Sequence, residues 1–308
     1  MAHGGGDGML LRIGGAPISW GVCEIPGWGS WPPYERVLDE VAAAGFEGTE
    51  LGPWGFLPAD PGRLAAELDR RGLAVASGFV PLDLKNPADA PVSEARTRQT
   101  AALLQRLGAQ HILLSDAGDP VRERIAGRPE LTRTHGLTAE EWPGYLERLQ
   151  RLARLSLEEY GLVPCFHPEA GIYVENPDEI AALMDGTEPS LVRLCLDTGQ
   201  IAFGGGDPLA ITERYHDRLS YIHLKDIDLP RLRGLLAEGR TYVETAKQDV
   251  FVEPGRGSLD LSAFLRMIQA MGYSGWIVLE QDRVWRPEID TLGSAYRSRQ
   301  YLRRYFGV

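Results

Sequence analysis

Helices that end at a glycine and lead directly into an apolar segment recur along this chain, and this pattern constrains the fold more than any other feature. The glycine after a helix adopts the left-handed conformation that stops it. The apolar residue that follows begins the next strand. These junctions read Ala-Ala-Gly-Phe at 43–46, Arg-Arg-Gly-Leu at 70–73, Arg-Leu-Gly-Ala at 106–109, Glu-Tyr-Gly-Leu at 159–162 and Ala-Met-Gly-Tyr at 270–273.

The segments between these junctions alternate strand and helix almost throughout. Apolar runs of this length are typical of buried parallel strands. Strands are expected at 13–20, 46–51, 73–80, 110–115, 162–167, 191–197, 219–224 and 275–280. Helices are expected at 33–44, 61–72, 88–107, 138–160, 176–184, from 207 onward, 258–271 and 289–305. Eight strand–helix units predict an α/β fold, a single (β/α)8 TIM barrel.

The connections also support one barrel. Residues 1–10 are predicted to be a flexible leader without the order of a signal peptide, and 11–308 to be the barrel domain. Residues 117–137 are expected to form an irregular active-site loop, and 230–249 a polar connection with a short helix. A doubly wound sheet is the alternative, but no Gly-x-Gly-x-x-Gly follows the first strand.

Charge and cysteine content limit the functional classes. The net charge of -11 disfavours a nucleic-acid partner, because lysines and arginines supply most of such affinity. The three cysteines form no Cys-x-x-Cys pair, which argues against a disulfide framework and favours a reducing cytoplasm. No apolar run reaches the roughly 18 residues that a membrane span needs. The expected partner is therefore a small molecule.

Four predicted strands end in a residue that can bind a metal: His167, Asp197, His223 and Glu280. Parallel barrel strands bring their C-terminal ends to one face, where barrel enzymes hold their chemistry. Imidazole and carboxylate ligands suit Mn²⁺, Mg²⁺, Co²⁺ or Zn²⁺. The four endings together predict a divalent-metal site.

The fifth strand leaves the ligand open. Three candidates are available: His167 ends the strand, Glu169 lies on the loop just beyond it, and Glu175 is either a further candidate or part of the approach to the next helix. Either His167 or Glu169 is expected to be the ligand. At the last strand, Asp282 competes with Glu280.

Motifs along nearly the whole chain resemble the xylose isomerase-like TIM-barrel family of sugar isomerases and epimerases, and within it the inosose dehydratase branch. The segments that carry the resemblance are Ala16-Pro17-Ile18-Ser19-Trp20-Gly21, Gly48-Thr49-Glu50-Leu51-Gly52, Ala76-Ser77-Gly78-Phe79, Phe166-His167-Pro168-Glu169-Ala170-Gly171, Cys195-Leu196-Asp197-Thr198-Gly199, His223-Leu224-Lys225-Asp226, Pro254-Gly255-Arg256-Gly257 and Val278-Leu279-Glu280-Gln281-Asp282. The resemblance implies a metal-dependent enzyme, with manganese among the candidate ions, that acts in carbohydrate or inositol metabolism. The resemblance is also compatible with a homo-oligomer, since barrels of this family often form dimers.

The chain departs from the family pattern at two places. Many members carry Glu-Asn-His where this chain has His167-Pro168-Glu169, so His167 replaces the first carboxylate ligand. The dehydratase branch resembles His-Pro-His followed by Gly-Thr, whereas this chain has Glu169 for the second His and Ile172 for Thr. Gln200 stands where a His commonly follows Asp-Thr-Gly. These departures concern the residues expected to set the substrate and the metal preference.

Other residues near the expected mouth are candidates for substrate contact. Glu50 would contact substrate hydroxyls or act as acid or base, and Lys225 would bind an enolate or protonate a leaving hydroxyl. Arg256 would bind an anionic or polyhydroxy substrate. An apolar wall for the sugar ring would consist of Trp20, Trp54 and Phe79.

The expected reaction begins at a carbonyl. Glu280 or Glu169 would remove the neighbouring carbon-bound proton from a keto-sugar or keto-inositol and so form an enediolate. Reprotonation gives isomerisation or epimerisation, whereas expulsion of a β-hydroxyl gives dehydration, and the ligands do not select among them. The rival hypotheses are an abasic-site endonuclease, which the negative charge disfavours, and a non-catalytic sugar-binding barrel.

Overall fold

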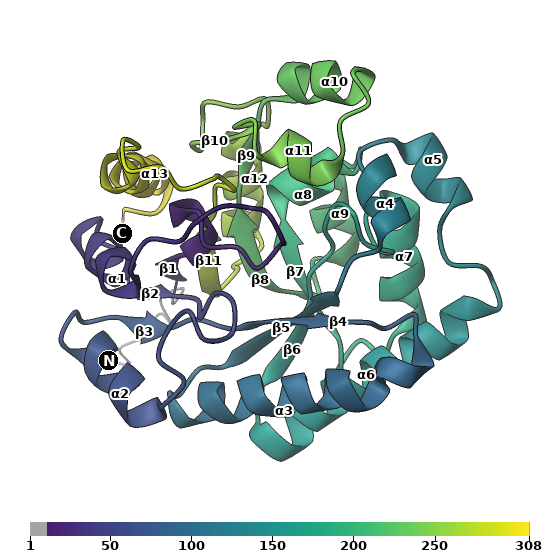
Figure 1. Cartoon of the computed structure of the whole chain (residues 1–308), viewed down its shortest axis with the longest axis horizontal. Coiled ribbons are helices and arrows are strands. Elements are labelled where there is room, and N and C mark those ends of the chain that lie inside the picture. The colour runs from purple at the N-terminus through teal and green to yellow at the C-terminus, as the bar shows by residue number, and fades with distance from the viewer. Residues whose placement is uncertain (1–10, 308) are drawn as a thin grey trace, which may run out of the picture.

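The computed structural model describes residues 11–307, so the predicted leader at 1–10 lies outside the described residues. Its main sheet is parallel, in the order β3-β2-β1-β11-β8-β7-β6-β5-β4, and helices surround it (Figure 1). The strands are β1 (Leu11–Gly15), β2 (Gly48–Thr49), β3 (Ala74–Val75), β4 (Phe79–Leu82), β5 (His111–Asp116), β6 (Val163–Phe166), β7 (Arg193–Asp197), β8 (Leu219–Leu224) and β11 (Gly275–Leu279).

The sheet closes through the expected third strand, which is split into β3 and β4. These two segments lie at opposite ends of the strand order but are separated by only Ala76, Ser77 and Gly78. The Leu51 N–H donates to the Ser77 carbonyl at 3.0 Å on one side, and the Leu113 N–H donates to the Gly78 carbonyl at 3.0 Å on the other. The predicted (β/α)8 class is therefore confirmed.

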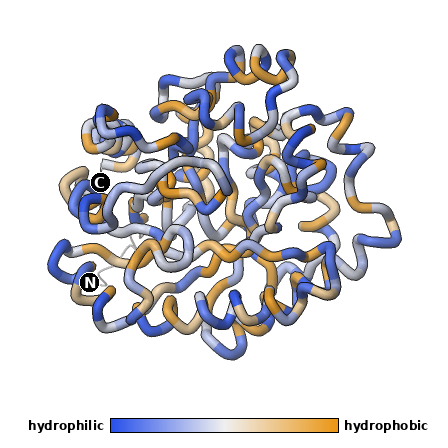
Figure 2. Tube along the Cα trace, in the orientation of Figure 1, coloured by the Kyte–Doolittle hydropathy of each residue, from blue (hydrophilic) through white to orange (hydrophobic). Residues whose placement is uncertain are grey.

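The outer helices bury apolar faces, and several of them start at an Asp-Pro or Asn-Pro pair. Asp60, Asn176 and Asp207 each accept backbone N–H bonds at a helix start, and proline follows each of them. The hydropathy alternates along the helical turns, as Figure 2 shows. The main helices are α1 (Tyr34–Ala43), α2 (Pro61–Asp69), α3 (Ala90–Arg106), α6 (Glu141–Tyr160), α7 (Pro177–Gly186), α9 (Pro208–Tyr215), α12 (Leu261–Ala270) and α13 (Thr291–Phe306).

Two segments differ from the expectation. The first strand ends at Gly15, and Pro17–Trp20 forms a 3-10 helix, η1, because proline cannot continue a ladder of backbone donors. The connection at 117–137 is not irregular but contains α4 (Pro120–Ile125) and α5 (Pro129–Thr134). The remaining short elements are η2 (Pro87–Asp89), α8 (Thr198–Phe203), β9 (Asp226–Ile227), α10 (Leu229–Ala237), α11 (Tyr242–Ala246) and β10 (Phe251–Val252), of which α10 and α11 occupy the connection at 230–249.

A buried arginine holds α4 over the barrel. Arg122 is fully buried and forms two 2.8 Å bonds with the Glu179 carboxylate on α7. It also donates to the Ile172 carbonyl at 2.8 Å and to the Thr132 carbonyl at 2.6 Å. This group therefore fixes the loop after β5 against the loop after β6.

Replacing Arg122 by Met is expected to lower the free energy of unfolding by about 3–5 kcal/mol, because Glu179 would remain buried without its partner. Urea denaturation followed by circular dichroism measures the change. The matched control is Arg133→Met, which removes an exposed pair with Asp178 and should cost no more than about 1 kcal/mol. Equal losses for the two variants would contradict a special role for the buried pair.

No helix within residues 11–307 is both long and apolar enough to span a membrane.

Candidate active site

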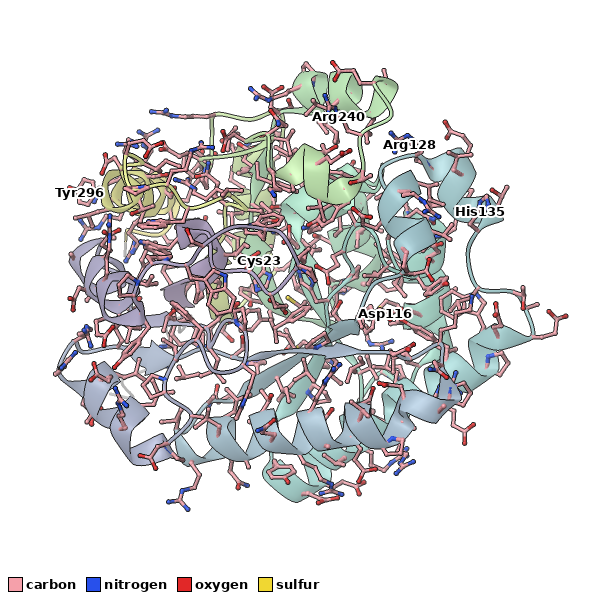
Figure 3. The ribbon with its side chains drawn as sticks, viewed as in Figure 1. Cys23, Asp116, Arg128, His135, Arg240 and Tyr296 are labelled. Carbon is pink, nitrogen blue, oxygen red and sulfur yellow. The ribbon has the colours of Figure 1, made fainter. Side chains whose placement is uncertain are left out.

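A cavity of about 700 Å³ opens where the barrel strands end, and most of the predicted catalytic and metal residues line it. Its lining includes Glu50, His167, Glu169, His223, Lys225 and Glu280. Cys23 and Asp116 also line it, and Figure 3 places both over the middle of the barrel, away from peripheral residues such as Tyr296 and His135. The site therefore lies on the face that the strand endings predicted.

Asp197 ends β7 and has two separate tasks. Its Oδ1 atom accepts N–H bonds from Gly199 at 2.8 Å and Gln200 at 2.9 Å, and so caps α8. Its Oδ2 atom lies 3.0 Å from Lys225 Nζ. Burial would raise the pKa of Asp197, but the Lys225 charge and the nearby imidazoles hold it well below its usual range. Asp197 therefore remains ionised, with one oxygen directed into the site.

His223, near the end of β8, is held by one ring nitrogen and leaves the other facing carboxylates. Its Nε2 lies 2.9 Å from Glu50 Oε1, which also accepts from the Tyr221 hydroxyl at 2.8 Å. Its Nδ1 lies 3.4 Å from Glu280 Oε2 and 3.8 Å from Asp197 Oδ2. Burial would lower the pKa of His223, but Glu280 and Glu50 raise it to about 9. Burial would raise the pKa of Glu50, but the charge of His223 lowers it below its usual value.

His167 is the least satisfied polar side chain of the site. It is buried, and neither ring nitrogen has a hydrogen-bond partner among the described residues. Its Nε2 lies 3.5 Å from Asp197 Oδ2, and its Nδ1 lies 4.0 Å from Glu169 Oε2. A buried imidazole without a partner is costly, so this geometry indicates a ligand that the ring would contact.

Buried atoms without a hydrogen-bond partner test whether a divalent cation fits, although Asp197 Oδ2 among them has the ion pair with Lys225. His167 Nε2, Asp197 Oδ2 and His223 Nδ1 all lack hydrogen-bond partners within residues 11–307, and Glu280 Oε2 lies beside them. Two imidazoles and two carboxylates form a donor set suited to Mn²⁺, Co²⁺ or Zn²⁺. The sets of three ligand atoms found within 4.8 Å of one another are Glu50, His223 and Glu280, and His167, Cys195 and His223, so Asp197 belongs to neither of them. The donor set therefore fits a divalent cation.

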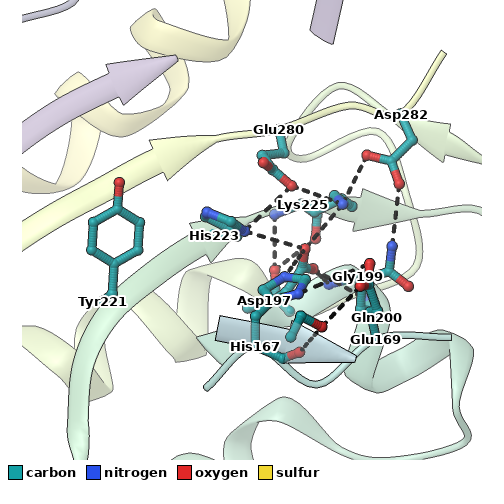
Figure 4. A network of polar contacts seen from close by, with 12 residues as sticks. His167, Glu169, Asp197, Gly199, Gln200, Tyr221, His223, Lys225, Glu280 and Asp282 are labelled. Atoms are coloured by element: carbon teal, nitrogen blue, oxygen red, sulfur yellow. Dashed lines mark hydrogen bonds and ion pairs between the residues drawn. The ribbon is translucent and has the colours of Figure 1, made fainter. Parts of the chain in front are cut away.

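Lys225 lies among the carboxylates of the site (Figure 4). Its Nζ is 3.0 Å from Asp197 Oδ2, 2.9 Å from Glu280 Oε2 and 2.8 Å from Asp282 Oδ1. Burial alone would lower the pKa of Lys225, but these carboxylates raise it well above its usual value. Burial raises the pKa of Glu280, and the nearby His223 and Lys225 charges oppose that rise.

Glu169 differs from Asp197, Glu280 and Asp282 because its only ion-pair contact among the described residues is the 4.0 Å one with His167. Its Oε1 lies 2.9 Å from the Ser115 hydroxyl, which also lies 2.8 Å from the His167 carbonyl oxygen. The hydroxyl has one proton to donate, and the carbonyl can only accept it. The arrangement therefore suits a protonated Glu169 that donates to Ser115. Burial agrees, since it raises the pKa of Glu169 to about 8.

The expected substrate wall is only partly in the cavity. Phe79 lines it and makes a T-shaped contact with the His167 ring, with ring centroids 5.9 Å apart. Trp20 is instead buried in the outer core, where its indole N–H donates to Glu40 at 2.8 Å. Trp54 is 45% exposed outside the cavity, and the exposed Arg256 pairs with Glu253 at 3.2 Å. The structure thus gives Trp20, Trp54 and Arg256 no place in the cavity lining.

Glu175 is also outside the site. Its two oxygens accept the Gly127 N–H at 2.7 Å and the Gly171 N–H at 2.9 Å, so it ties two loops together. Gln200, which marked a departure from the family pattern, accepts the Ala170 N–H and contacts Tyr242 and Asp282. The sequence did not single out Tyr242 or Ser115, because their contacts are with residues far away in the chain.

Asp116, at the end of β5, was also missed, although its position after an apolar strand is the signal that identified Asp197. It is buried, accepts from the Tyr145 hydroxyl at 3.2 Å, and burial raises its pKa to about 7. An unfolded chain has an Asp pKa of about 3.9. The folded state therefore binds this proton more tightly, and stability falls as the pH rises from about 4 to about 7.

Replacing Asp116 by Asn is expected to remove this pH dependence. At pH 8 the variant should be more stable than the parent by about 2–4 kcal/mol, and the difference should vanish towards pH 4. Thermal unfolding across that pH range measures the effect. The control is Asp69→Asn, an exposed carboxylate at the end of α2. A stability difference that is constant with pH would contradict the prediction.

Comparison with known proteins places this geometry in a family. The model of the xylose isomerase-like TIM barrel family matches residues 38–305. An inosose dehydratase of Geobacillus kaustophilus (strain HTA426) is 32% identical over 273 residues, which cover 89% of this chain and 88% of that protein.

Two solved structures show the same fold. An L-ribulose 3-epimerase has a TM-score of 0.70 at 18% identity, covering 97% of this chain and 95% of its own. A zinc-bound protein named IOLI has a TM-score of 0.69 at 14% identity, covering 96% of this chain and 100% of its own.

Proposed function

The chain belongs to the xylose isomerase-like TIM barrel family, and from this premise we propose that it removes water from a keto-cyclitol or related keto-sugar, as an inosose dehydratase does. One observation carries the proposal. Among the acidic residues of the cavity, Glu280 lies 2.9 Å from the Lys225 ammonium group, whereas the only ion-pair contact of Glu169 among the described residues is the 4.0 Å one with His167. Two carboxyl groups in unlike environments are the usual arrangement for a base and an acid.

Glu280 is the proposed base. Its Oε2 lies 2.9 Å from Lys225 Nζ and 3.4 Å from His223 Nδ1, and the positive charge beside it, from Lys225 or from a bound divalent cation, favours its ionised form. Burial makes its carboxylate more basic than in water. Glu280 takes the proton from the carbon next to the substrate carbonyl. The electron pair left on that carbon moves towards the carbonyl oxygen and gives the enediolate.

Glu169 is the proposed acid. It transfers its proton to the hydroxyl on the next carbon, the carbon–oxygen bond breaks, and water leaves. The fixed positive charge of Lys225 stabilises the negative charge that develops. Glu50 orients His223 through the 2.9 Å contact, and Phe79 gives the ring an apolar surface. The product has lost one water and gained one carbon–carbon double bond.

The proposal includes a divalent metal, held by His167, Asp197, His223 and Glu280. When bound, such a cation acts as a Lewis acid on the carbonyl oxygen. The donor atoms without partners support it, and the zinc in the IOLI structure is consistent with it. Zn²⁺, Mn²⁺ and Co²⁺ all suit these ligands, and nothing in the donor set selects one of them.

Proton NMR in D₂O tests the proposal. The protein is loaded in turn with Mn²⁺, Co²⁺, Zn²⁺ or Mg²⁺ and incubated with inososes, ketohexoses or keto-glycosides. Where the ion broadens the signals, the loaded protein is removed before the spectrum is recorded. We expect deuterium exchange next to the carbonyl together with water loss from an inosose. Exchange with a changed stereocentre and no water loss would instead identify an epimerase. Binding without any exchange would identify a sugar-binding barrel.

The endonuclease hypothesis has little support. Among the described cavity-lining residues, Lys225 is the only lysine and there is no arginine, and three carboxylates already surround Lys225. Binding of a phosphate backbone depends on such cations.

A further inference from the structure

The side chain of Lys225 is built into the site more firmly than a residue that only contacts substrate would need to be. It is 2% exposed, and its ammonium group lies 5.1 Å from the centre of the Phe251 ring. The Thr198 hydroxyl lies 2.9 Å from the Lys225 backbone nitrogen and 2.7 Å from its carbonyl oxygen. Both ends of the residue are therefore fixed.

Gly199 leaves the space that the aliphatic part of Lys225 occupies. A Cβ atom at Gly199 would meet Lys225 Cγ at 2.7 Å and Cβ at 2.9 Å. Such distances are too short for carbon atoms, so any side chain at this position would displace the lysine. The glycine in the turn after Asp197 therefore leaves room for the Lys225 side chain to reach the carboxylates.

Two of the three carboxylates around Lys225 belong to the proposed metal ligands. Its Nζ contacts Asp197 Oδ2 and Glu280 Oε2, the same two oxygens that face the imidazoles. A divalent cation on those oxygens would lie close to the ammonium group, and like charges repel strongly in a buried site.

The third carboxylate offers Lys225 a separate partner. Asp282 Oδ1 lies 2.8 Å from Nζ, its shortest ion-pair contact, and Asp282 is not in the ligand set. Its Oδ2 accepts from Gln200 Nε2 at 3.2 Å, which holds the carboxylate in place (Figure 4). Asp282 can therefore keep the ammonium group when the other two oxygens bind a cation.

We infer that Lys225 is an internal counter-ion that competes with the divalent cation for Asp197 and Glu280, and that Asp282 retains it when the cation binds. This inference rests on the proposed metal site and adds that the chain tunes its own metal affinity. Without the cation, the lysine neutralises carboxylates that would otherwise repel one another. When the cation is bound, Lys225 gives up its contacts with Asp197 and Glu280 and keeps the one with Asp282.

The test is a calorimetric titration of Mn²⁺ into the full-length protein after treatment with a chelator. Lys225→Met should bind Mn²⁺ about tenfold more tightly than the parent, or tighter still, because a competing charge is removed. Asp282→Asn should bind it more weakly, because the lysine then has only the ligand oxygens. The control Glu244→Gln removes a cavity carboxylate with no ion pair to Lys225 and should change the dissociation constant by less than about twofold.

Opposite shifts for Lys225→Met and Asp282→Asn support the inference, since a merely structural role for Lys225 predicts weaker binding in both. Unchanged or weaker binding by Lys225→Met overturns it while leaving the metal site intact. Absence of Mn²⁺ binding by both the parent and Lys225→Met overturns the metal part of the proposed function as well. If Lys225→Met does not fold, Asp282→Asn decides, and binding at the parent's affinity or tighter overturns the inference.

Discussion

Asp197→Asn is expected to abolish measurable metal binding and to lower turnover by about a thousandfold. This factor corresponds to about 4 kcal/mol of lost transition-state stabilisation. The variant separates the two tasks of Asp197. An Asn side chain can still accept the Gly199 and Gln200 N–H bonds through its oxygen and cap α8. Its amide nitrogen, however, is a poor substitute for the ionised Oδ2 atom. Calorimetric titration with Mn²⁺ and the NMR assay measure the two losses.

The matched control is Asp207→Asn, because Asp207 caps α9 in the same way, through the Leu209 N–H at 2.9 Å, but lies outside the active-site cavity. Both variants should show nearly the parent's unfolding temperature, and only Asp197→Asn should lose metal and turnover. Full activity in Asp197→Asn would reject the metal site. A collapse of stability in this variant alone would show that Asp197 acts mainly through the fold.

Glu169→Gln is expected to lower the rate of water loss by about 10²–10⁴-fold while deuterium exchange next to the carbonyl continues. The variant keeps the shape of the side chain and its contact with Ser115 but has no acidic proton to give to the leaving hydroxyl. Glu280→Gln should instead lose exchange and water loss together, because proton removal comes first. NMR in D₂O follows both processes in one sample.

This pair of variants assigns the two roles, so a reversed pattern would exchange them. Loss of exchange in Glu169→Gln with exchange retained in Glu280→Gln would make Glu169 the base. The control is Glu130→Gln, a change at an exposed carboxylate on α5 that should leave both rates at the parent's values.

Much of the site could be predicted because strand endings carry local signals. Asp197, His223 and Glu280 each lie at or next to the C-terminal end of a strand, and closure of the barrel brings them to one face. Glu175, the third candidate near the fifth strand, accepts two loop N–H bonds instead. Trp20 shows the limit of this reasoning. It was placed on a strand and in the substrate wall, but Pro17 begins a 3-10 helix that turns the ring into the core beside α1.

The sequence by itself determined the alternation of the main strands and helices, the barrel class and the strands that end in ligand-type residues, because each depends on neighbours a few positions away. Tertiary structure alone decided that Lys225 contacts three carboxylates, that His167 has no hydrogen-bond partner among the described residues, and that Glu169 lies against Ser115. These contacts join side chains tens of residues apart. Charge state and competition depend on distances across the barrel, which no local pattern records.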